Sequence, residues 1–100
     1  MAKTIDITGK LTNERPVLKL GEGLEFEVDN SKNTVLSLDE AGGIEKSMEL
    51  LLGKEAVKKI EELNLSFENY LYVFFAACSA ATGESVEVIE ARFQRERQEV

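Results

Sequence analysis

The longest apolar stretch of the chain, YLYVFFAACSAATG, runs from Tyr70 to Gly83 and contains no charged residue. With the residues just before it, the apolar segment extends from Phe67 to Ala81, interrupted by Glu68 and Asn69. A helix of this length spans about 22 Å at roughly 1.5 Å per residue, whereas the hydrocarbon core of a membrane is about 30 Å thick. We therefore predict a helix packed in a protein core and no membrane-spanning segment.

Helical periodicity places two aromatic residues on the side of this helix that should face solvent. At about 100° per residue, Tyr72 and Phe75 lie within roughly 40° of Glu68. A helix that is apolar nearly all round is either buried on both sides or used in an interface. Two alternatives therefore stand for Tyr72 and Phe75: burial under the helices of residues 44–63, or contact with another chain. The opposite side carries the residues expected in the core, Tyr70, Val73, Phe74, Ala77 and Ala81.

The first third of the chain has the period-two pattern of β-strands. In TIDITGKL, residues 4–11, the apolar residues Ile5, Ile7 and Leu11 share one face, which predicts a first strand. VLKLGEGLEFEV, residues 17–28, predicts a hairpin whose turn is GEG, with Lys19 facing a glutamate across the strands. Because two or three strands cannot bury an apolar face alone, helices must cover it.

The remainder of the chain predicts four to five short helices over about residues 32–97. Ser31 and Ser66 are expected N-caps, and Gly53 and Gly83 are expected helix ends. The chain is thus predicted to be one α+β domain over residues 1–100. Its parts are an antiparallel hairpin or small sheet within residues 3–29 (the strand-rich part being 1–30), a helical part at 31–97, and a polar tail at 94–100 that frays into solvent.

Residue types exclude most kinds of catalytic and metal site. The chain has no histidine and one cysteine, Cys78, so it lacks a Ser-His-Asp triad, a Cys-His pair and histidine metal ligands. Cys78 lies among apolar residues, which predicts a small buried side chain and not a reactive thiol. The paired carboxylates Glu61 and Glu62 point about 100° apart on a helix and do not converge on a substrate. We expect no catalytic residue, no metal and no cofactor.

Charge and cysteine content indicate the kind of partner and compartment. The formal net charge is -7, so the chain should be repelled by nucleic-acid backbones. Its first ten residues, MAKTIDITGK, lack the apolar region of a secretory signal. Together with the single cysteine, this predicts a cytoplasmic protein without nucleic-acid or membrane contacts.

The pattern of helix lengths and apolar spacing resembles a known family. LLLGKEA, then LSFENY, a hydrophobic helix closed by TGE, and a glutamate-rich helix ending ARFQ carry the likeness, together with the strand-rich start and FEVDNS. These features are similar to the small tail assembly chaperones of siphoviruses that infect Gram-positive bacteria. The likeness covers nearly the whole chain.

The resemblance implies a non-enzymatic role in building the phage tail. Such chaperones coat the tape measure protein, keep it soluble and help to recruit the major tail protein. Many exist in a short form and in a longer form made by ribosomal frameshifting, and the polar end QRERQEV would suit the short form. The implied partners are therefore the tape measure protein, the major tail protein, the longer form and other copies of the chaperone. The family has no catalytic motif to transfer.

A partner-binding surface is the remaining hypothesis for individual residues. We expect Tyr72 and Phe75, helped by Met48 or Leu52, to contact the tape measure protein or another copy. Replacing Tyr72 and Phe75 by polar residues should then weaken binding without unfolding the chain. The alternative function is a small acidic phage inhibitor of a host protein, whose binding should depend strongly on salt. A virion component is a third possibility.

Overall fold

A β-hairpin opens the folded body of the protein. The structure is a computed structural model that describes residues 3–11 and 14–98. Strands β1 (Val17–Gly21) and β2 (Leu24–Glu27) pair antiparallel, with Leu18 opposite Phe26 and Lys19 opposite Glu25. The turn between them uses Gly23 at φ 76°, a conformation that favours glycine. The predicted hairpin is confirmed, and the glutamate predicted to face Lys19 across the strands is Glu25. The Lys19 ammonium itself lies 3.3 Å from the Glu22 carboxylate in the turn.

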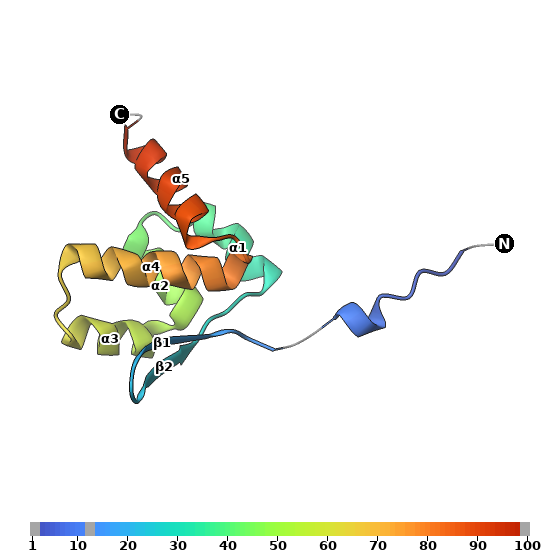
Figure 1. The fold of residues 1–100 in the computed structure, drawn as a ribbon, viewed down its shortest axis with the longest axis horizontal. Helices are drawn as coiled ribbons and strands as arrows, with labels where there is room; N and C mark the ends of the chain where they lie inside the picture. Colours follow the sequence, from blue (N-terminus) through green and yellow to red (C-terminus); the bar gives the residue numbers. More distant parts are fainter. Residues whose placement is uncertain (1–2, 12–13, 99–100) are drawn as a thin grey trace.

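The predicted first strand over residues 4–11 is wrong. Residues 3–11 instead form an extended arm with one 3₁₀ turn, η1 (Thr8–Lys10), and every residue in the arm is exposed. The Asp6 carboxylate accepts hydrogen bonds from the Thr8 backbone N–H (2.9 Å) and hydroxyl (2.6 Å). This local pairing offers the backbone an alternative to a strand ladder. Figure 1 shows the arm projecting away from the rest of the molecule.

A short helical segment follows the hairpin, as predicted. Helix α1 (Lys32–Ser37) continues into the 3₁₀ turn η2 (Leu38–Glu40), and both end before the glycine pair at 42–43. Ser31 is the N-cap, its hydroxyl accepting from the Thr34 N–H at 3.4 Å. Asp29 supports this start, because its carboxylate accepts from the Ser31 N–H at 3.0 Å and the Thr34 hydroxyl at 2.8 Å.

Two helices of equal length form the next layer. Helix α2 (Ile44–Leu52) and helix α3 (Lys54–Glu62) meet at Gly53, whose φ of 91° lets the chain turn between them. Asn64 lies just after α3 at φ 51°, in the left-handed conformation that asparagine adopts more readily than most residues. The hairpin joins this layer through the Asp29 N–H, which donates to the Leu51 carbonyl at 2.8 Å.

The apolar stretch forms the long central helix α4 (Phe67–Thr82). Its predicted ends are confirmed: the Ser66 hydroxyl accepts from the Asn69 N–H at 3.1 Å, and Gly83 is left-handed at φ 81°. Helix α5 (Val86–Gln98) then begins after Ser85, whose hydroxyl accepts from the Val88 N–H at 3.2 Å. The described part of the predicted polar tail, residues 94–98, is helical, and residues 99–100 lie outside the described residues.

The core lies where α4 meets α2, α5 and the hairpin, and α3 contributes Ile60 to it. Helix α4 contacts β1, α2 and α5, so it is the element around which the others pack (Figure 1). The α+β fold class is confirmed, with a two-stranded sheet followed by the helices. Within residues 3–11 and 14–98, no helix has both the length and the apolar character needed to cross a membrane. The buried cluster comprises Val28, Met48, Leu51, Ile60, Phe75, Ala77, Cys78, Ala81 and Ile89.

Candidate protein-binding surface

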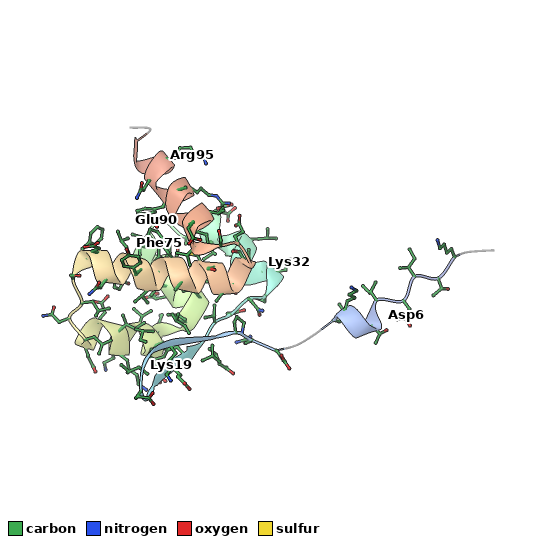
Figure 2. All side chains as sticks on the ribbon, viewed as in Figure 1. Asp6, Lys19, Lys32, Phe75, Glu90 and Arg95 are labelled. Carbon is green, nitrogen blue, oxygen red and sulfur yellow. The ribbon has the colours of Figure 1, made fainter. Side chains whose placement is uncertain are left out.

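Helix α5 packs on α4 through aromatic side chains. The Phe93 ring lies with its centroid 5.3 Å from that of Phe75 and 6.3 Å from that of Phe74, both at steep interplanar angles. Such edge-to-face pairs stabilise a contact beyond the area they bury. Ile89, one turn earlier on α5, is buried with them. Figure 2 shows Phe75 where α5 meets α4, with Glu90 of α5 nearby.

Polar contacts fix the turn from which α5 leaves α4. The Arg92 guanidinium donates two hydrogen bonds to the Glu84 carboxylate, at 2.6 and 3.2 Å. The Ser79 hydroxyl donates to the Glu84 carbonyl at 2.7 Å, and the Thr82 hydroxyl accepts from the Glu84 N–H at 3.2 Å. The hydrogen bonds from Arg92 hold the pKa of Glu84 below its ordinary value. The Glu84 backbone is thus hydrogen-bonded to α4, and the Glu84 side chain is hydrogen-bonded to α5.

The four residues predicted to bind a partner do not share one surface. Tyr72 is 54% exposed, Leu52 is half-buried, and Phe75 and Met48 are core residues with 4% and 0% exposure. The sequence left open whether Phe75 is covered by this chain or another. It is covered by this chain, and the Phe93 ring of α5 is one of the groups that cover it. Of the four, Tyr72 and Leu52 are the ones that offer surface to a partner.

Tyr72 borders a small pocket on one side of the α4–α5 junction. The pocket holds about 190 Å³, so it has room for little more than a side chain. Its lining combines apolar and aromatic residues with two glutamates, Glu68 and Glu90. The lining residues, hereafter the Tyr72 pocket, are Glu68, Leu71, Tyr72, Phe75, Glu90, Phe93 and Gln94.

A larger groove also borders α5, and Phe93 lines both hollows. It holds about 530 Å³ and brings together α1, η2, the start of α2, the end of α4 and α5. Leu36 of α1 lines this groove and is 65% exposed, and the charged lining residues are Asp39, Glu84 and Arg92. The apolar lining of this α1–α5 groove consists of Val35, Leu36, Leu38, Ile44, Phe74, Cys78, Ile89 and Phe93.

Sequence reasoning missed the α1–α5 groove because its walls come from separate parts of the chain. The one local signal is Leu36. Val35 of α1 and Leu38 of η2 are half-buried against the core, which leaves Leu36 as an apolar residue without a place there. An unassigned leucine of this kind marks either a strand, which the alternation of Leu36 with Leu38 suggests, or an exposed contact.

Cys78 lies on the wall of the α1–α5 groove but is chemically quiet. Burial raises the pKa of its thiol to about 11, an effect that the charge of Arg92 offsets only in part. Since the thiolate is the nucleophile, a thiol with this pKa stays protonated and unreactive near neutral pH. Its predicted role as a small buried side chain agrees with its 9% exposure.

Neither the search for a metal site nor the comparison with known proteins identifies a further functional site. Among residues 3–11 and 14–98, no group of three or more histidine, cysteine, aspartate or glutamate side chains is arranged to hold a metal ion. Hollows that a partner could enter include the Tyr72 pocket, the α1–α5 groove and a groove beside β2. Comparison with protein-family models, curated proteins and solved structures gives no significant match.

Proposed function

We propose that this protein is a non-catalytic tail assembly chaperone of a siphovirus infecting Gram-positive bacteria. It acts in the host cytoplasm, where it binds the tape measure protein, keeps it soluble and helps to recruit the major tail protein. The observation that supports this proposal most directly is the apolar α1–α5 groove of about 530 Å³.

An amphipathic helix is the kind of partner that the α1–α5 groove fits. Helix-in-groove recognition places apolar side chains at i, i+3, i+4 and i+7 into a hydrophobic channel. The groove here is lined by aliphatic and aromatic side chains together with the charged residues Asp39, Glu84 and Arg92. A long, largely helical client such as a tape measure protein repeats such stripes along its length, so several copies of the chaperone can bind one client.

The acidic surface supports the same role. With 19 acidic against 12 basic residues, the chain carries a net charge of -7. A client coated by many such copies becomes strongly negative, and mutual repulsion between coated clients opposes aggregation. The apolar groove and the acidic surface therefore supply the two properties of a solubilising chaperone, attachment and charge.

Coexpression of the tape measure protein from the same phage tests the proposal. The expected result is soluble tape measure protein in the presence of this chain and precipitate in its absence. Leu36→Asp should reduce the soluble fraction severalfold, because it places a charge in the α1–α5 groove without disturbing the core. Val88→Asp is the matched control, since Val88 is 47% exposed and lines neither the groove nor the Tyr72 pocket.

Several outcomes would contradict the proposal. If the tape measure protein stays insoluble in the presence of the wild-type chain, this protein is not its chaperone. If Leu36→Asp and Val88→Asp reduce the soluble fraction of the tape measure protein equally, the α1–α5 groove is not the binding site. Tight binding to a host protein that weakens steeply with salt would favour the inhibitor instead. Recovery of the chain in purified particles would favour a virion component.

A further inference from the structure

The N-terminal arm, residues 3–11, carries apolar side chains that this chain leaves uncovered. Ile5, Ile7 and Leu11 are 76%, 54% and 70% exposed. Ile5 and Ile7 alternate with Thr4, Asp6 and Thr8, a pattern that suits a strand with one buried face. Figures 1 and 2 show the arm and its side chains extending away from the body, with Asp6 labelled on it.

The hairpin offers an open strand edge. In an antiparallel pair, the backbone N–H and C=O of one residue point to the same side and those of the next residue to the other. The Val28 N–H donates to the Pro16 carbonyl at 2.9 Å, so the backbone groups of Val28 and of Phe26 point toward β1. Those of Glu25 and Glu27 therefore point away from β1. Within residues 3–11 and 14–98, no backbone hydrogen bond from outside the hairpin satisfies them.

A groove runs along this edge of β2. It holds about 420 Å³ and lies between β2 and the corner where α2 meets α3. Three successive residues of β2, Glu25, Phe26 and Glu27, border it. Successive side chains of a strand point to opposite faces, so a groove bordered by all three follows the strand edge. Leu50, Leu51 and Leu52 of α2 line it from the other side, and Leu50 is 39% exposed.

The charges of the β2 groove and of the arm are complementary. The groove is lined by five carboxylates, of Glu25, Glu27, Asp29, Glu49 and Glu55, against two cations, Arg15 and Lys59. One of these cations, Arg15, lies 3.9 Å from the Asp29 carboxylate. The arm carries two lysines, Lys3 and Lys10, against one carboxylate, that of Asp6. A net positive segment flanked by lysines thus matches a net negative groove.

We propose that residues 4–8 of one copy pair as a third strand with the open edge of β2 in a second copy. The contact would satisfy the outward backbone groups of Glu25 and Glu27 and turn Ile5 and Ile7 toward the leucines of α2. Strand addition of this kind is an established mode of protein recognition. The arm would first exchange its local Asp6–Thr8 hydrogen bonds for ladder hydrogen bonds. The contact between copies is independent of the proposed binding of the tape measure protein.

A second copy is the occupant that the geometry favours. The arm precedes β1, whereas the open edge belongs to β2, so an arm folding back on its own chain would have to cross the face of its own hairpin. In the structure the arm points away from that hairpin (Figure 1). Each copy has one arm and one β2 groove, so reciprocal exchange between two copies uses both.

The arm is tested first, by sedimentation equilibrium of the full chain over a range of concentrations. The wild type should self-associate, and Ile5→Asp should raise the dissociation constant at least about tenfold, because a buried apolar side chain is lost. Thr4→Asp is the matched control: it adds the same charge one residue away, on the opposite face, and should change the constant less than about threefold. Both positions lie outside the core, so the variants should keep the wild-type circular dichroism.

The open edge of β2 is tested by placing proline at either residue of one cross-strand pair in the hairpin. Glu25→Pro removes a backbone donor on the open edge of β2, and proline is tolerated where an edge N–H faces solvent. Lys19→Pro makes the same change directly opposite, on the other edge of the hairpin. Glu25→Pro should abolish association and Lys19→Pro should preserve it, with thermal unfolding of each variant confirming that the body is folded.

Four results would overturn the inference. The first is a wild-type chain that remains monomeric at all concentrations. The second is an association that Thr4→Asp and Ile5→Asp, or the two proline variants, weaken equally. The third is a cross-link, introduced between the arm and β2, that forms within single chains and not between chains of different mass. An association lost with Leu36→Asp but kept with Ile5→Asp would place the contact in the α1–α5 groove and would likewise reject the arm.

Discussion

Truncation of Phe75 gives the sharpest test of how α5 covers α4. The Phe75 side chain is 4% exposed and its ring lies 5.3 Å from Phe93 and 5.9 Å from Phe74. Replacing a buried phenylalanine by alanine typically lowers the free energy of unfolding by about 3–5 kcal/mol, through lost transfer energy and the cavity left behind. The edge-to-face contact with Phe93 contributes about 0.5–1.5 kcal/mol of this loss.

Urea denaturation followed by circular dichroism measures the effect. With a slope of about 2 kcal/mol per molar, a loss of about 4 kcal/mol lowers the unfolding midpoint by about 2 M. Tyr72→Ala is the control, because Tyr72 is on the same helix but 54% exposed, and its midpoint should move by less than about 0.5 M. A Phe75→Ala midpoint that matches that of Tyr72→Ala would refute the packing of α5 described above. The same burial changes the expectation for polar replacement of both residues, which should now unfold the chain.

Three further predictions concern single groups. The Cys78 thiol, with a pKa of about 11, should react with an alkylating reagent at pH 8 far more slowly in the native chain than in urea, as followed by mass spectrometry. Hydrogen bonds from Ser31 and then Thr34 lower the pKa of Asp29 from 3.8, so they stabilise the fold above that pH and lose effect as pH falls through the native pKa. The wild type should therefore exceed Asp29→Asn in unfolding free energy at pH 7, and the gap should close toward pH 3; a constant gap would contradict this. Ser66→Ala removes the N-cap of α4 and should lower the melting temperature by about 4–8 °C, corresponding to about 1 kcal/mol.

The elements that sequence predicts well are those whose signals are local. Ser66 and Gly83 bound α4 because a capping hydroxyl and a left-handed glycine act on the backbone within one helical turn. The hairpin follows from alternation on both sides of a turn that needs Gly23. These features require no knowledge of which distant segments meet.

The features that sequence predicts poorly depend on distant partners. Period-two alternation in the arm specifies a strand only where an open edge is available, and locally Asp6 captures the Thr8 backbone instead. Likewise, the spacing of Ile89 and Phe93 predicts which face of α5 is apolar. It does not predict which side of α4 that face covers. That side is set by the turn at Glu84, and it decides that Phe75 is buried while Tyr72 is exposed.

The order in which the helices pack has a consequence for the speed of folding. Helix α2 contacts α3, α4 contacts α5, and β1 contacts β2, so most packing partners are neighbours in sequence. Chains dominated by such local contacts close short loops and fold in about microseconds to milliseconds. The contacts of α4 with α2 and β1 are the longer-range step and should set the rate. Stopped-flow refolding should therefore show its main phase within the instrument's first milliseconds, with a minor slow phase from isomerisation of the bond before Pro16. A main phase lasting seconds would contradict this expectation.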